Sequence, residues 1–307
     1  MKTDETTEAS LGNAQRASSL WTLSGMTWLE LVRRTWRQFQ QDRILDQSAK
    51  LAFYFMLSIF PLLLFLITLL GLLLQSSPDF QAELQKYLAA VIPSSASGLV
   101  AKTLEEITTS SGGGRLSLAL LFTLWTASRC VVAIMGGLNI AYGVEDPRPW
   151  WKKNLVALGL TLVLLVLIAA ALFAMVYGSR YGATIGNEIG ASVVMGWVWR
   201  ILTWVLPLMF VLLAFNMLYL YAPNVKHRRW RWLMPGTVVG VVLWLAGSFG
   251  FQLYLSYFDR YTVTYGSIGA IIILLLWFYL SAIAFLVGGE VNSELKKASG
   301  QVEQTPT

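Results

Sequence analysis

The chain has 307 residues, of which 56% are hydrophobic and only 13% charged, and its formal net charge is +6. Soluble domains carry about 25% charged residues, so this composition, with a mean hydropathy of +0.58, predicts a polytopic all-α membrane protein. One cysteine, Cys130, and one histidine, His227, exclude an intramolecular disulfide and any metal site built from several cysteines or histidines, and we expect no cofactor.

The N-terminal region divides into two parts. Residues 1–26 are polar and have no apolar stretch typical of a signal peptide, so we predict a disordered cytoplasmic tail. From Thr27 to Leu45, apolar residues recur at helical spacing with arginines on the other side, which predicts an amphipathic helix. Two interpretations are equally open: the helix lies on the cytoplasmic membrane surface, or it packs on the protein's own membrane domain.

Six apolar segments follow, each long enough to cross a bilayer. They span approximately residues 50–74, 116–141, 155–177, 197–221, 233–257 and 268–289. In the first connection, residues 75–115, two short amphipathic helices are predicted, broken at Pro93. We therefore predict a six-helix membrane domain over residues 27–297 and a disordered cytoplasmic tail over residues 298–307.

The basic residues predict the orientation, because cytoplasmic loops carry an excess of Lys and Arg. Fourteen fall on one predicted side: Arg33, Arg34, Arg37, Arg43, Lys50, Arg148, Lys152, Lys153, Lys226, Arg228, Arg229, Arg231, Lys296 and Lys297. Five fall on the other: Lys86, Lys102, Arg115, Arg180 and Arg260. Both termini are thus predicted to be cytoplasmic, in the bacterial inner membrane. This asymmetry accounts for most of the net charge, so we expect membrane lipids, some of them anionic, as partners, and no nucleic acid.

Four strings, in this order along the chain, resemble the YihY/BrkB family of bacterial inner-membrane proteins. They are LAFYFMLSIFPLL (residues 51–63), WTASR…GGLNIAYGVE (residues 125–145), YAPN (residues 221–224) and YGSIGAIIILLLWFYLSAIAFLVGGEVN (residues 265–292). The resemblance covers nearly all of residues 30–297 and implies six membrane spans. Members have long been labelled "ribonuclease BN", others are linked to virulence, and some are suspected of exporting envelope lipids or other amphipathic solutes.

The ribonuclease label finds little support in the residues. Phosphodiester hydrolysis normally uses carboxylates that hold metals, or His and Lys groups placed for acid–base work. The predicted spans contain almost no acids before Glu290, and His227 lies among cations in KHRRWRW. We therefore expect no enzymatic activity.

Arg129 is the main candidate for function, because it lies near the middle of the second predicted span, where an arginine is costly. Trp125 shares its helical face, and Asn139 lies about 80° away around the helix. Either Arg129 binds an anionic group in a cavity, or it is structural and bonded to helix-end carbonyls, Glu290 or Glu145. Asn139 is more typical of a hydrogen bond between helices than of a ligand contact.

Three further residues are weaker candidates. Glu290 fits a proton-coupling or substrate-binding carboxylate as well as a helix-end acid paired with Lys296 or a loop arginine. Pro61 and Pro207 are candidate hinges, although membrane helices tolerate proline generally. The sequence therefore favours a transporter or flippase of an anionic amphiphile or small solute, able to form a homo-oligomer; the alternative is a non-transporting scaffold for the cell envelope.

Overall fold

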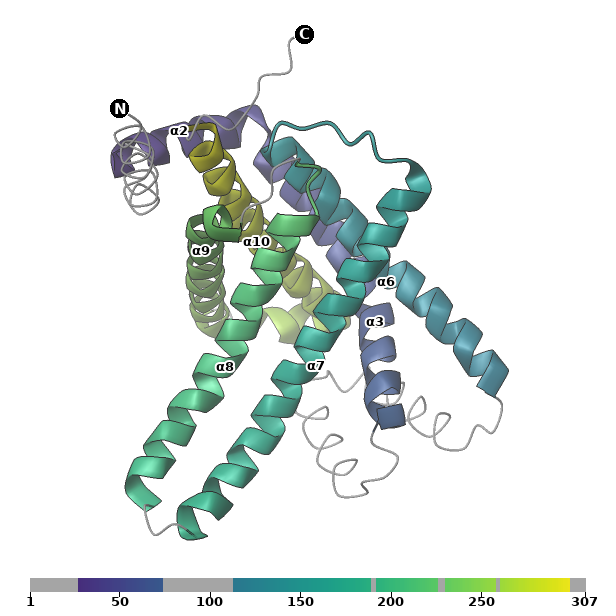
Figure 1. Cartoon of the computed structure of the whole chain (residues 1–307), viewed down its shortest axis with the longest axis vertical. Coiled ribbons are helices and arrows are strands. Elements are labelled where there is room, and N and C mark those ends of the chain that lie inside the picture. Colours follow the sequence, from purple (N-terminus) through teal and green to yellow (C-terminus); the bar gives the residue numbers. More distant parts are fainter. Residues whose placement is uncertain (1–26, 74–112, 189–191, 226–229, 258–259, 299–307) are drawn as a thin grey trace, which may run out of the picture. The chain divides into compact units, whose positions relative to one another are not determined.

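The computed structural model describes residues 27–73, 113–188, 192–225, 230–257 and 260–298, and every element in these ranges is a helix (Figure 1). The helices are α2 (Trp28–Gln41), α3 (Ile44–Leu73), α6 (Gly113–Ala141), α7 (Trp150–Glu188), α8 (Ser192–Tyr221), α9 (Trp230–Tyr257) and α10 (Arg260–Ala298). The predicted all-α class is therefore confirmed for the described residues. The two tails and the predicted short helices of residues 75–115 lie outside them almost entirely.

Each of the six predicted spans falls within one of the long helices α3 and α6 to α10. Within the described residues, four stretches are long and apolar enough to cross a membrane: Leu121–Ala141, Trp150–Ala171, Pro235–Leu255 and Ile271–Ala298. A fifth apolar stretch, Val205–Tyr221, is shorter. The membrane class is thus supported by four helices, while the count of six passes stays a prediction.

Helix α2 is shorter than the segment predicted from residues 27–45. Its first turn is capped by Thr27, whose Oγ1 accepts a hydrogen bond from the Glu30 amide at 3.4 Å, the N-terminal half of a capping box. The helix ends at Gln41 with Asp42 as its C-cap, because Arg43 adopts the left-handed conformation with φ of 49°. A new helix, α3, then begins at Ile44, six residues before the predicted start of the first span.

The chain folds as two units that share several helices. The first unit comprises Met1–Ala52, Met135–Pro147 and Phe215–Thr307, and the second comprises Phe53–Ile134 and Arg148–Ala214. The first unit therefore contains the described parts of α2, α9 and α10 together with the ends of α3, α6 and α8. The second contains α7 and the remaining parts of α3, α6 and α8.

Close packing of α9 against α10 organises the first unit. A Cβ added at Gly288 of α10 would lie 2.6 Å from the Gly236 carbonyl oxygen and 3.0 Å from the Gly240 Cα, so the backbones of the two helices nearly touch. Small residues permit this approach in membrane helices. Reciprocal hydrogen bonds add to it farther along the pair: the Trp244 indole donates to Ser281 Oγ at 3.1 Å, and the Trp277 indole donates to Ser248 Oγ at 3.3 Å.

Helix α2 lies across the C-terminal part of α10, and Figure 1 shows the two in contact. Leu31 is the buried residue of α2 and packs with Val291 and Leu295 of α10. Four large apolar side chains of α2 are instead exposed: Trp28, Leu29, Val32 and Trp36. One edge of α2 thus packs on α10 while an apolar stripe is exposed, and both interpretations of this helix stay predictions.

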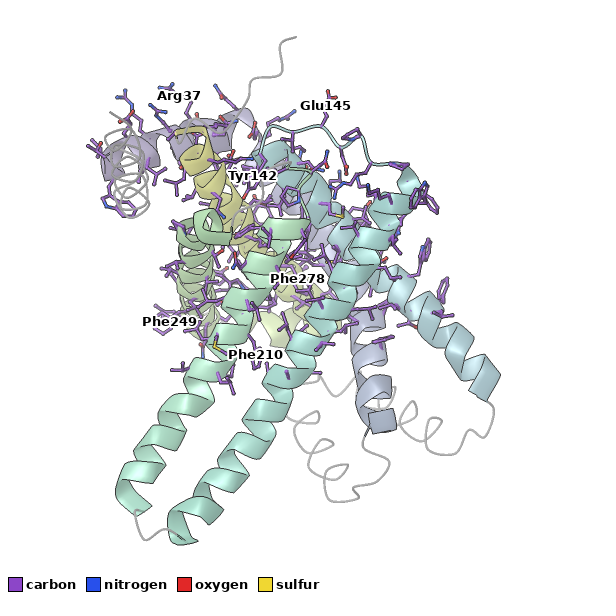
Figure 2. The ribbon with its side chains drawn as sticks, in the orientation of Figure 1. Arg37, Tyr142, Glu145, Phe210, Phe249 and Phe278 are labelled. Carbon is purple, nitrogen blue, oxygen red and sulfur yellow. The ribbon has the colours of Figure 1, made fainter. Side chains whose placement is uncertain are left out.

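Exposed apolar side chains also cover α7 and α9. On α9 they are Val238, Val242, Leu243, Leu245, Phe249, Leu253 and Tyr254, and Figure 2 shows Phe249 projecting away from the helix. On α7 they include Leu155, Leu162, Val163, Val166 and Ile168. Soluble monomers rarely expose contiguous apolar surface on this scale, so these faces fit contact with lipid chains.

Candidate functional site

Arg129 of α6 is held by two residues of the second unit. Its Nη2 donates a hydrogen bond to the Asn154 side-chain oxygen, and its guanidinium carbon lies 4.8 Å from the ring centroid of Trp125. Asn154 is itself fixed, because its Nδ2 donates to the Trp150 carbonyl at 2.8 Å within α7. The guanidinium group is therefore oriented by a neutral amide and an aromatic face.

One donor of this guanidinium group has no partner. Arg129 Nε is buried without a hydrogen bond, although the residue as a whole is partly exposed and Trp125 is 46% exposed. Among the described residues, no carboxylate forms an ion pair with Arg129. The arrangement can thus offer a positive charge and a free N–H to an oxyanion.

The partner of Arg129 was not predicted from the sequence. Helix-end carbonyls, Glu290 and Glu145 were considered, whereas the structure pairs Arg129 with Asn154, and Trp125 is in place as its helical spacing indicated. Figure 2 shows Glu145 on the connection after α6. The signal that could have drawn attention to it is the amide of Asn154 directly before a long aliphatic run in α7.

Asn139 is occupied by contacts within the first unit. Its side-chain oxygen accepts a hydrogen bond from the Asn224 amide at 2.8 Å, and its Nδ2 donates to Asp146 at 3.3 Å. The Asn139 carbonyl also accepts from Val144 at 2.9 Å, across a turn in which Gly143 has φ of 60°, the arrangement of a Schellman motif. These bonds join α6 to the connections that follow α6 and α8, and both a bond between helices and a role in binding substrate stay predictions.

Glu290 lies in a buried polar cluster at the C-terminal part of α10. Its side chain is 0% exposed, and neither carboxyl oxygen has a hydrogen-bond donor among the described residues. The Asp42 carboxyl, at the end of α2, lies within hydrogen-bonding reach of it. The charge of Lys297, which donates to Glu294 at 2.7 Å, acts on Glu290, while the predicted pairing of Glu290 with Lys296 or a loop arginine stays a prediction.

Two more polar side chains complete this cluster. Asn292, 2% exposed, accepts a hydrogen bond from the Gly236 amide at 2.9 Å, while its Nδ2 has no partner. Tyr142, which directly follows α6, is 8% exposed, and its hydroxyl also has none (Figure 2). Burial raises the pKa of the Tyr142 phenol well above its ordinary value, a side-chain contact with Asn292 lowers it in part, and the nearby Glu290 raises it further. Tyr142 therefore keeps its proton and remains a donor.

The two candidate hinges lie inside continuous helices. Pro61 is within α3 and Pro207 is within α8. Each removes one backbone donor from its helix. Both helices continue beyond their prolines, so a hinge role stays a prediction.

The strings that carry the family resemblance meet in the first unit. A Cβ added at Gly137 would lie 3.1 Å from the side chains of both Leu51 and Leu286. Three of the four strings therefore meet at this point. The fourth, YAPN, joins through Asn224, whose amide bonds Asn139. These residues, far apart in the sequence, build one core.

The fold and these polar groups define the class: an α-helical integral membrane protein with buried polar side chains in its apolar helices. The family model described as "Virulence factor BrkB" matches residues 35–307. The chain belongs to this BrkB family, as its sequence strings predicted.

Similar proteins agree with this assignment. The chain is 37% identical over 261 residues to the "Putative ribonuclease-like protein YfkH" of Bacillus subtilis, covering 85% of this chain and 93% of that protein. It is 30% identical to the "UPF0761 membrane protein VSAL_I2938" of Aliivibrio salmonicida, covering 83% of this chain and 79% of that one. It is 27% identical to the "UPF0761 membrane protein RSc1559" of Ralstonia nicotianae, covering 86% and 58%. No solved structure matches the chain.

One of these names refers to an enzymatic activity. The B. subtilis protein carries a ribonuclease-like name. The family description and the UPF0761 names state no enzymatic activity. Within the described residues, no group of three or more His, Cys, Asp or Glu side chains could hold a metal ion.

Proposed function

We propose that this protein moves an anionic amphiphile or a small anionic solute across the bacterial cytoplasmic membrane, with both termini in the cytoplasm, and that Arg129 binds the anion. The observation that carries the proposal is the set of contacts around Arg129. It lies within the apolar stretch Leu121–Ala141, oriented by Asn154 and Trp125, with a buried Nε–H that has no acceptor.

The energetics favour a ligand over a purely structural arginine. A buried donor without a partner costs about 1–3 kcal/mol, and an arginine within a bilayer costs at least about 2.5 kcal/mol. A carboxylate partner from the same protein would offset these costs, yet Arg129 is paired with a neutral amide. A phosphate or carboxylate oxygen of a substrate would supply both the missing acceptor and the counter-charge.

A second candidate function is a non-transporting scaffold for envelope assembly. The close backbone packing of Gly236, Gly240 and Gly288 favours it, because this part of the molecule resists rearrangement. That packing belongs to the first unit, whereas Arg129 belongs to the second, so it does not argue directly against an anion site.

The test is lipid flipping by purified protein in proteoliposomes. Fluorescently labelled phosphatidylglycerol, which is anionic, is compared with labelled phosphatidylethanolamine, which is zwitterionic, and the quencher dithionite measures the fraction that reaches the outer leaflet. For small solutes, uptake of radiolabelled phosphate is the corresponding assay. We expect the wild type to move at least one anionic probe, and the zwitterionic lipid more slowly.

Three variants assign the activity to Arg129. Arg129→Leu removes the charge and Arg129→Lys keeps it without the planar fork, so each should lower the rate by about tenfold to hundredfold, equivalent to about 1.5–3 kcal/mol for a charge-assisted hydrogen bond. Thr126→Ala is the control, because this hydroxyl on the same helix bonds only the Phe122 carbonyl. Thermal melting in detergent accompanies each rate. Rates unchanged in both arginine variants, or losses that lowered melting fully explains, would refute the anion site and favour the scaffold.

A further inference from the structure

Around the buried Glu290, the described side chains bring more carboxyl groups together than cations. Glu290 and Asp42 bring two carboxyl groups together, and a third, Glu294, lies nearby on α10. The cation in the cluster, Lys297, bonds Glu294 at 2.7 Å and is partly exposed. Among the described residues, Lys297 is the cation whose charge acts on Glu290, and it already bonds Glu294; a fully buried Glu290 carboxylate beside the partly buried Asp42 carboxyl is therefore disfavoured by desolvation and by like charge.

The hydrogen bonds of the Asp42 and Glu290 carboxyl groups lead to the same conclusion. Ionised carboxylates only accept hydrogen bonds, so two of them cannot bond each other. Asp42 Oδ2 already accepts a hydrogen bond from Gln38 Nε2 at 2.8 Å, so this carboxyl group acts as an acceptor. Both oxygens of Glu290 lack a donor, which suits a carboxylic acid that donates its own proton.

We propose that Glu290 and Asp42 form a proton-binding site, in which the carboxylic acid of Glu290 donates its single proton to the carboxylate of Asp42. The proton removes one negative charge and creates the hydrogen bond that the buried Glu290 carboxyl otherwise lacks. The ligand is the proton itself, bound and released at a Glu290 oxygen.

Tyr142 and Asn292 make this site capable of exchange. The Tyr142 hydroxyl and the Asn292 Nδ2 are both more than nine-tenths buried, lie by the pair and have no acceptor. When the proton leaves Glu290, these two donors are available to its carboxylate. The site thus has one set of partners for the protonated state and another for the ionised state, which a merely structural acid would not need.

This site does not depend on the proposed anion transport. Its residues belong to the first unit, whereas Arg129 belongs to the second. A failure of the anion assay would leave the proton site standing, and the reverse also holds.

Infrared difference spectroscopy of the full-length protein in lipid nanodiscs tests the proposal. At neutral pH, exposed carboxyl groups are ionised, so a carbonyl stretch from a protonated carboxyl group reports a buried acid. We expect one such band in the wild type, shifted in deuterated water and in protein labelled with ¹³C at the glutamate side-chain carboxyl. Because the label leaves the protein unchanged, this result does not depend on any variant folding.

Three variants test whether the carbonyl band comes from the Glu290 side chain. Glu290→Gln should abolish it, and Asp42→Asn should abolish or shift it, whereas Glu30→Gln should leave it unchanged, because Glu30 is exposed and paired with Arg34 at 2.6 Å. Absence of the band from the wild type at neutral pH would overturn the proposal, as would a band that persists in Glu290→Gln.

Discussion

The contact between α9 and α10 can be tested by a single methyl group at Gly288. In Gly288→Ala, the new Cβ would lie 2.6 Å from the Gly236 carbonyl oxygen and 3.0 Å from the Gly240 Cα. The Tyr219 hydroxyl, a side-chain group, lies closer still, but the other two neighbours are backbone atoms, so rotation of a side chain cannot relieve the whole clash. The two helices must separate, which weakens the surrounding contacts, including the 2.6 Å hydrogen bond from the Tyr219 hydroxyl to the Phe285 carbonyl.

The expected change in the free energy of unfolding is the difference between two opposing effects. Overpacking a close contact costs about 1–3 kcal/mol, and more where backbone must move. Replacing glycine with alanine inside a helix contributes up to about 1 kcal/mol in the opposite direction. Gly288→Ala should therefore lower the free energy of unfolding by about 1–3 kcal/mol. The matched control is Gly247→Ala on α9, where an added Cβ meets no atom within 4 Å, and stability should stay the same or rise by up to about 1 kcal/mol.

The assay is thermal unfolding in detergent followed by tryptophan fluorescence, checked by unfolding in a denaturing detergent. The glycine variants are compared in one lipid and detergent mixture, because these affect apparent stability. If Gly288→Ala melts within error of Gly247→Ala, the two helices do not approach as closely as the structure describes. The account of the first unit's core would then be wrong.

Three other predictions follow from the same sequence and structure. Asn139→Ala should destabilise the protein by about 1 kcal/mol, because it leaves the partly buried backbone amide of Asn224 without its acceptor, and unchanged melting would contradict this role. In a Cys130→Ala background, an impermeant thiol reagent should label a cysteine at Ser95 but not one at Ser299 in intact spheroplasts, and the opposite pattern would refute the predicted orientation. Purified protein should show no divalent-metal-dependent RNA cleavage, and turnover that is lost in Glu290→Gln would contradict this.

The helices could be predicted because each is encoded locally. Long apolar runs indicated the helices from residue 44 to residue 298, and the membrane class, before any contact was known. Arg129 was recognisable for the same reason, since a charge within an apolar run needs no partner to be noticed. The helix boundaries were less accurate: Arg43 ends α2 through its left-handed backbone, and residue type gives little warning of that conformation outside glycine.

The sequence by itself thus determined the class, the family and the principal candidate residues, because composition, hydrophobic length and short strings are properties of neighbouring residues. Only the tertiary structure decided the partners. Arg129 bonds Asn154 rather than an acid, since α6 and α7 place these residues together. Asp42 reads in the sequence as an ordinary helix-end residue, and it becomes significant only because α2 packs across α10 and brings it to Glu290. Contacts between residues so far apart depend on how helices pack, and apolar periodicity does not specify which faces will meet.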